Sequence, residues 1–341
     1  MYLITGATGI VGTHVLMQLL EKELPIYALY RDEKNIQKVK NTFALYKHST
    51  DNALDEQFQK INWVKGDVTD ITSLADAMEN CDYVFHCAAI VSFKKSDAKK
   101  LRKINVEGTA NVVNACLKKG IKKLCHVSST SAVGNSEKNE LITEKNKWKK
   151  DEYTSEYGVT KYQAEMEVWR GSEEGLDVVI VNPSIIIGPG DWNTSSAELF
   201  QKVWNGLKYY TLGKNAFVDV RDVAQSMNLL LHSDIKNERF LVCSENWTYQ
   251  QVFQKIALGL AKKPAHIQVK VWFLGLIWRI EAVRSFLFGS APIVTKETAH
   301  SSMASREYDA SKVKKALDMD FIPLEKSIAD TSKLFLQSKQ G

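Results

Sequence analysis

A glycine-rich turn between residues 5 and 12 constrains the fold of this chain more than any other feature. Residues 1–12 read MYLITGATGIVG, and the apolar spacing of a helix follows over residues 15–20. Gly6 permits a tight turn out of a strand, Gly9 lets the backbone approach a pyrophosphate, and Gly12 lets the helix lie close to the sheet. The pattern predicts a strand, a glycine turn and a helix start that bind a dinucleotide.

The start of this helix offers unpaired N–H groups and a partial positive charge to phosphates. Glycine turns of this kind also serve packing alone, and that alternative stays open at this point. The contacts that we expect from the turn are made by Gly6, Thr8, Gly9, Ile10, Val11 and Gly12.

Length and composition fit one large α/β domain with a smaller part appended. The 341 residues are 44% hydrophobic, and apolar strand patterns alternate with helical ones. We expect a Rossmann-type doubly wound parallel sheet. Residues 1–182 should form the NAD(P)-binding domain, with returns near 216–242. Residues 183–341, with a helix opened by Asp222, should form a smaller, mainly helical region that binds the substrate.

The charge and cysteine patterns exclude several classes of protein. The net charge of +5 is interpreted as a small surplus of basic residues spread along the chain, and this surplus favours an anionic ligand. The chain has no zinc-finger spacing and no aromatic-basic pattern, so we do not expect it to bind nucleic acid. The five cysteines show no CxxC spacing, which predicts reduced thiols, no metal site and a cytoplasmic location. No apolar run is long enough for a transmembrane segment, and a strand beginning at Tyr2 leaves no room for a signal peptide.

Arg31 follows the second strand, where the cofactor ribose is recognised. A cation at this place pairs with a 2′-phosphate, whereas an acid accepts from a 2′-hydroxyl. Arg31 therefore favours NADP(H), with Lys38 as a second phosphate contact. In the alternative, Asp32 is the ribose ligand and the cofactor is NAD(H).

Other strand ends supply further cofactor contacts. Asp67 either accepts from the adenine amino group or caps a helix that starts near Thr72. The remaining expected contacts are Val68, the small residues Ala88 and Ala89, and the pair Pro183 and Ser184. His86 is interpreted as a core residue with satisfied hydrogen bonds.

Tyr157 and Lys161 lie one turn apart on a helix that follows a strand ending in hydroxyl residues. Other Tyr-x-x-x-Lys strings occur in the chain, but none follows such a strand. Tyr157 would donate a proton to a carbonyl oxygen, and Ser129 would donate a hydrogen bond to that oxygen. Ser128 and Thr130 are alternatives for the role of Ser129. Lowering a phenol pKa from about 10 to about 7 needs roughly 4 kcal/mol, which the Lys161 ammonium and an oxidised nicotinamide can supply.

Several motifs, taken in order, resemble the extended short-chain dehydrogenase/reductases, the NAD(P)-dependent epimerase/dehydratase family. They are TGATGIVG at 5–12, Asp67, HCAA at 86–89, NVEGT at 105–109, VSS at 127–129, YGVTK at 157–161 and NP at 182–183. The resemblance runs to about residue 225 and implies Ser129, Tyr157 and Lys161 as the catalytic set, supported by Asn105. It also allows a homodimer through the helices near 98–118 and 155–170.

Within that family, the stretch that runs from Tyr30-Arg31-Asp32 through Asn35 to Lys38 resembles dihydroflavonol reductase-like members, which are NADPH reductases. Residues 217–224 resemble the stretch that lines substrate pockets across the family. Plant flavonoid reductases carry a substrate-binding asparagine where this chain has Gly134, so a flavonoid is not expected. Residues 268–288 are strongly apolar and are interpreted as a substrate-lining helix or lid, with core packing or membrane-surface contact as alternatives. The expected activity is reduction of a ketone or aldehyde on a fairly apolar molecule. The alternatives are an NAD-dependent nucleotide-sugar epimerase/dehydratase, a hydroxysteroid-type dehydrogenase and a redox sensor without turnover.

Overall fold

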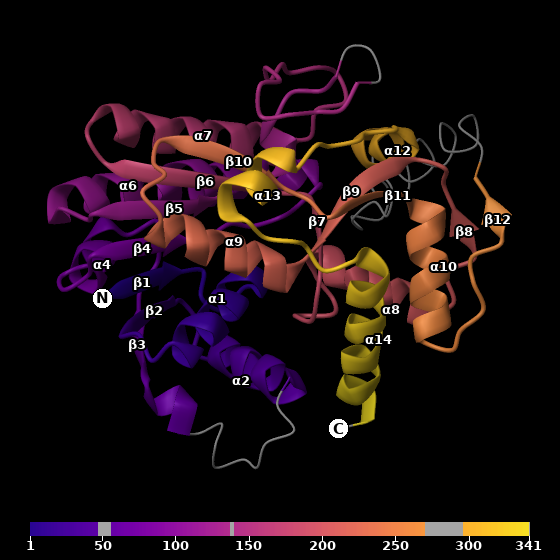
Figure 1. Ribbon diagram of the computed structural model, residues 1–341, viewed down its shortest axis with the longest axis horizontal. Coiled ribbons are helices and arrows are strands. Elements are labelled where there is room, and N and C mark those ends of the chain that lie inside the picture. The colour runs from indigo at the N-terminus through magenta and orange to yellow at the C-terminus, as the bar shows by residue number, and fades with distance from the viewer. Residues whose placement is uncertain (47–55, 137–139, 270–295, 341) are drawn as a thin grey trace.

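A seven-stranded parallel sheet forms the centre of the molecule (Figure 1). The computed structural model describes residues 1–46, 56–136, 140–269 and 296–340. The strand order reverses between β1 and β4, which confirms the predicted doubly wound fold and places its switch point there. From edge to edge the sheet consists of β10 (Glu238–Val242), β6 (Asp177–Pro183), β5 (Lys123–Val127), β4 (Tyr83–His86), β1 (Tyr2–Thr5), β2 (Ile26–Tyr30) and β3 (Ile61–Lys65).

Both faces of this sheet are covered by helices. On β6, Val179 and Val181 face one hydrophobic core, and Val178 and Ile180 face the other. Parallel strands that are buried on both sides need such continuous apolar runs. The first core is closed by α1 (Ile10–Glu21), α2 (Lys34–Tyr46) and α9 (Val220–His232), and the second by α4 (Ile71–Ala77), α6 (Gly108–Lys119) and α7 (Glu156–Glu173).

The C-terminal region carries two small sheets and a third core around Phe200, Phe217 and Phe335. Its strands are β7 (Ile185–Ile187), β8 (Tyr209–Tyr210), β9 (Lys214–Asp219), β11 (Glu245–Thr248) and β12 (Ile267–Gln268). Its helices are α8 (Glu198–Trp204), α10 (Tyr249–Gly259), α12 (Lys296–Met303), α13 (Ser311–Leu317) and α14 (Leu324–Gln340), and Figure 1 shows most of them beside the main sheet. Among the strands that the structure describes in this region, only β10 returns to the main sheet, because β9 pairs with β7 and β11.

Two helix starts differ from the sequence-based expectation. Asp70, not Asp67, caps α4, since its Oδ1 accepts from the backbone N–H of Thr72 at 3.0 Å. Asp219, not Asp222, caps α9 in the same way. In both cases the capping residue is extended and directly precedes the helix, where a side-chain oxygen reaches the free N–H groups.

Three further expectations concern the membrane, the thiols and the apolar segment. None of the helices in the part of the chain that the structure describes could cross a bilayer. All five cysteines are free thiols. The expected lid at 268–288 lies outside the described residues from residue 270 onward, and with it the aromatic residues of that segment.

The Asp222 carboxyl is 2% exposed and accepts a hydrogen bond from the Ile322 N–H at 2.8 Å. Burial raises the pKa of Asp222 to about 7. Because this folded-state pKa lies above the unfolded one, the stability that Asp222 contributes is full below pH 4 and is lost as the pH rises to 7. We expect Asp222→Asn to match the parent protein at pH 4 and to exceed it by roughly 2 kcal/mol at pH 8. Urea unfolding at both pH values measures this, and an equal difference at the two would contradict it.

Candidate active site

The turn after β1 is shaped for close backbone approach. Gly6 has a φ of 65°, and a Cβ there would lie 2.5 Å from the backbone nitrogen of Ala88. A Cβ on Gly12 would lie 2.2 Å from the Gly6 carbonyl oxygen. Packing therefore explains these two glycines but not Gly9, which is exposed and precedes α1 without a side-chain cap. The first N–H groups of α1 remain available to a phosphate, so the chain's own residues fit a dinucleotide here.

The other predicted residues of this turn differ in exposure. Thr8 and Ile10 are half-buried beside Gly9, whereas Val11 is buried and can reach a ligand only through its backbone. The side chain of Ile10 packs against Gly190, which brings the loop after β7 over the turn.

Arg31, Asp32 and Lys38 have separate environments. The Arg31 side chain is 59% exposed and lies 3.8 Å from Asp67. One carboxylate oxygen of Asp32 accepts from the Lys34 N–H at the start of α2. Lys38 pairs with Asp191 at 2.9 Å, so a contact between Lys38 and a cofactor phosphate requires that pair to open. Arg31 is the most available of the three side chains.

The carboxyl ends of β3 and β4 hold the other expected adenine-side contacts. Oδ1 of Asp67 accepts from the backbone N–H and the hydroxyl of Thr69, both at 2.9 Å. Val68 is buried against Gly108, while Ala88 is half-buried and Ala89 exposed.

Pro183 and Ser184 follow at the end of β6, and both are buried. The Ser184 hydroxyl has no hydrogen-bond partner among the described residues. A buried hydroxyl without a partner at a strand end fits a contact with a bound group.

Ser129 and Tyr157 meet at the carboxyl end of β5. The Tyr157 phenol hydrogen-bonds the Ser129 side chain, whose oxygen also accepts from the Ser131 N–H at 3.1 Å. The rival hydroxyls have other partners: Ser128 donates to Glu165 at 2.6 Å, and Thr130 bonds Tyr308. Of the three hydroxyls, Ser129 is the one that the structure brings to Tyr157.

Lys161 is buried one turn along α7, and its Nζ donates to the Val127 carbonyl oxygen at 2.7 Å. Burial lowers the pKa of Lys161 to about 8, against the opposing effect of Glu165. Burial also raises the pKa of Tyr157, against the Ser129 hydrogen bond. The Lys161 ammonium is directed to a carbonyl and is not among the groups that shift the pKa of Tyr157 here, so its expected effect together with an oxidised nicotinamide stays a prediction. A raised pKa keeps the phenol protonated at neutral pH, as a proton donor requires.

Asn105 lies in a π-helical stretch, Arg102–Glu107, between two α-helical segments. It is 1% exposed, exchanges two hydrogen bonds with the Ile90 backbone and donates to Thr160 at 3.2 Å. Asn105 therefore links the segment after β4 to α7 and touches neither Ser129 nor Tyr157. His86, predicted as a satisfied core residue, bonds Thr5 and Thr109.

A buried carboxylate, Glu165, was not predicted as part of the site. Its Oε2 accepts from Ser128 at 2.6 Å and from Asn182 at 2.8 Å, and its Oε1 pairs with Arg239 at 3.0 Å. The Asn182 amide also donates to the Ser129 carbonyl at 3.0 Å. Glu165 thus joins α7 to the ends of β5 and β6 and holds the peptide that carries Ser129. A charged residue at a position four after Lys161, on the buried side of the helix, was the signal available in the sequence.

A cavity of about 280 Å³ lies beside Tyr157. The Phe93 ring packs edge-on against the Tyr157 ring at 5.9 Å and forms one wall. The cavity is lined by Phe93, Lys94, Lys95, Ala98, Thr154, Ser155 and Glu156. Its links to Tyr157 are the Phe93 ring and the residues Ser155 and Glu156, which directly precede Tyr157 in the chain.

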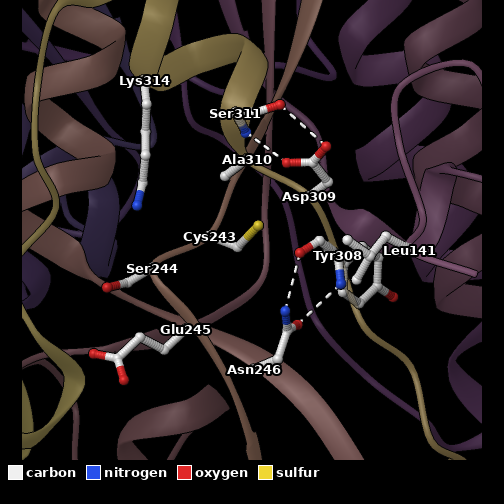
Figure 2. Close-up of a pocket in the computed structure, with 10 residues that line it drawn as sticks. All are labelled: Leu141, Cys243, Ser244, Glu245, Asn246, Tyr308, Asp309, Ala310, Ser311 and Lys314. Carbon is white, nitrogen blue, oxygen red and sulfur yellow. Dashed lines mark hydrogen bonds between the residues drawn. The ribbon is translucent and has the colours of Figure 1, made fainter.

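A separate cavity of about 200 Å³ lies between the end of β10 and the segment before α13 (Figure 2). Figure 2 shows that some of its polar groups are hydrogen-bonded to one another. Asn246 exchanges two hydrogen bonds with the backbone of Tyr308, and Asp309 accepts from the N–H and hydroxyl of Ser311. Its lining includes neither Ser129, Tyr157 and Lys161 nor the residues next to them in the chain, so we assign it no part in the chemistry.

Comparison with known proteins identifies the relatives of this arrangement. The model of an NAD-binding family described as male sterility protein matches residues 4–229. A putative dihydroflavonol 4-reductase from Synechocystis is 28% identical over 342 residues, covering 98% of this chain and 94% of the relative. Sterol demethylase protein B from Methylococcus capsulatus is 29% identical over 256 residues, covering 74% of this chain and 72% of that protein.

Among solved structures, the fold is similar to that of a UDP-glucose 4-epimerase from Thermotoga maritima. The TM-score is 0.76 at 18% identity, and the match covers 99% of both chains. At this identity the likeness concerns the fold.

Proposed function

We propose that this protein reduces a ketone or aldehyde of a small, fairly apolar molecule with NADPH. The proposal starts from its family: the chain belongs to this NAD-binding family, within the extended short-chain dehydrogenase/reductases, and is an NAD(P)-dependent oxidoreductase. The observation that carries the proposal is the contact between the Ser129 hydroxyl and the Tyr157 phenol, next to the buried Lys161. The three groups lie at the carboxyl ends of the strands, where the glycine turn also opens.

When bound, the nicotinamide supplies the hydride that reduces the carbonyl carbon. Ser129 donates a hydrogen bond to the carbonyl oxygen, and Tyr157 transfers its phenol proton to that oxygen as the negative charge develops. Lys161, held by the Val127 carbonyl, has two further N–H groups for a ribose hydroxyl. Its pKa of about 8 leaves it mostly protonated at neutral pH.

The preference for an apolar substrate is supported by the Phe93 wall of the cavity beside Tyr157. A nucleotide-sugar substrate would call for a cation that pairs with its diphosphate. Two arginines of the C-terminal half are engaged elsewhere, Arg221 with Asp219 and Asp330, and Arg239 with Glu165. We also propose that the cofactor binds to residues 1–182 with the return at β10, and the substrate mainly to residues 183–341.

The choice of NADPH is tested by titrating the parent protein and Arg31→Ala with NADPH and NADH. We expect the parent to prefer NADPH by about tenfold or more, about 1.4 kcal/mol, and Arg31→Ala to lose that preference. Lys34→Ala, which removes a neighbouring cation, is the control and should keep it. Equal binding of both cofactors by the parent would instead favour Asp32 as the ribose ligand, and the reductase proposal would then yield to the NAD-dependent epimerase.

A further inference from the structure

One segment holds a net positive charge as large as that of the whole chain, so the expectation that the surplus is spread along the sequence is wrong. Residues 94–103 hold six basic side chains and a single acid, so the formal charge of this segment equals the +5 of the whole chain. Outside it, basic and acidic residues balance. The single acid, Asp97, accepts a hydrogen bond from Ser92 at 2.6 Å.

All six basic side chains of this segment are exposed, and together we call them the basic ridge. Within its helical part, Leu101 and Ile104 are buried, and the basic side chains around them are exposed. None of the six forms an ion pair within the described ranges of the chain. The ridge consists of Lys94, Lys95, Lys99, Lys100, Arg102 and Lys103.

Large apolar side chains adjoin the basic ridge. Val91 is 46% exposed and Phe93 is 45% exposed, directly before the first two lysines. Exposed apolar side chains beside a row of cations are typical of surfaces that lie on a bilayer, where the apolar groups enter the interface and the cations meet anionic headgroups.

The composition of the ridge distinguishes a lipid surface from a protein partner. Five of the six cations are lysine, which is a mobile point charge. Protein interfaces are enriched in arginine, tyrosine and tryptophan and depleted in lysine. A diffuse anionic surface does not require the fixed, paired hydrogen-bond donors of an arginine guanidinium, so lysine ammonium groups are sufficient to bind it.

We propose that the basic ridge, with Val91 and Phe93, docks the protein on an anionic membrane surface. Phe93 and two lysines of the ridge also line the cavity beside Tyr157, so docking turns the mouth of that cavity toward the bilayer. An apolar substrate would then enter from the lipid. The inference goes beyond the proposed function, and it is measured without substrate or turnover, so the two can fail separately.

The test is sedimentation of the full chain with vesicles of phosphatidylcholine containing about one-third phosphatidylglycerol, in 0.1 M salt. The test variant carries Lys99→Gln, Lys100→Gln, Arg102→Gln and Lys103→Gln, which lie outside the cavity lining and keep good helix propensity. The control carries Lys118→Gln, Lys263→Gln, Lys315→Gln and Lys333→Gln, which remove the same charge from exposed, scattered positions. Circular dichroism confirms that both variants fold.

We expect the parent and the control to bind the anionic vesicles, and the test variant to bind at least about 100-fold more weakly, because each cation near such a surface adds to the affinity. Binding should fall with salt and be absent on pure phosphatidylcholine. Absent binding, or equal loss in the control, would overturn the proposal. So would binding to polyglutamate without binding to the anionic vesicles, since the ridge would then recognise a soluble acidic partner.

Discussion

Replacing Tyr157 by Phe is expected to lower kcat for carbonyl reduction by about 10³-fold or more, with the Kd for NADPH nearly unchanged. The substitution removes only the phenol oxygen, so the ring keeps its edge-on contact with Phe93 and the fold is preserved. The hydroxyl that loses its partner, Ser129, still accepts from the Ser131 N–H. Stopped-flow kinetics for the chemical step and fluorescence titration of NADPH measure the two quantities.

Tyr162→Phe is the matched control for that experiment. Tyr162 lies on the same helix, but its ring stacks on Trp148 at 4.2 Å and not on the Phe93 wall. Its removal should leave kcat within a factor of about two, since it gives no proton to the substrate. If Tyr157→Phe kept a tenth or more of the parent rate, another group would have to be the proton donor.

Replacing Glu165 by Gln is expected to destabilise the protein by roughly 4 kcal/mol, because one partner of a buried ion pair is lost. Arg239, whose side chain is only 18% exposed, would keep its positive charge but lose the carboxylate that pairs with it. The NH₂ group that replaces one carboxylate oxygen would also lie next to the NH₂ group of Asn182 or the guanidinium of Arg239. Two hydrogen-bond donors would then face each other without an acceptor. Urea unfolding monitored by tryptophan fluorescence measures the loss.

Glu167→Gln is the control for the Glu165 experiment, two residues along the same helix. Glu167 pairs with Arg170 at a half-buried position, and such pairs contribute about 1 kcal/mol or less. A similar decrease in the free energy of unfolding in both variants would show that helix α7 tolerates neither change. The hydrogen-bond network around Glu165 would then make no particular contribution to stability. If Glu165→Gln folds at low temperature, its kcat should fall more than its affinity for NADPH, since the Ser129 peptide loses its anchor.

Much of the main sheet could be predicted because its signals are local. β3 and β5, for example, are each a short run with apolar residues that ends at turn residues. The glycine turn follows from backbone geometry over a few residues, which explains why the tight turn at Gly6 and the close approach at Gly12 could be predicted. The same holds for Tyr157 and Lys161, whose spacing along one helix face is set by the helix itself.

The sequence by itself therefore determined the order of the strands' apolar patterns, the turn that precedes α1 and the residue types available for chemistry. Only the tertiary structure decided which side chains meet. Glu165 contacts residues of β6 and β10 and the residue after β5, which are up to 74 positions away, and Lys38 pairs with Asp191, 153 positions along the chain. The tertiary structure also placed the basic ridge near Tyr157. Such contacts depend on how distant segments pack in three dimensions, and no local spacing encodes the distance between them.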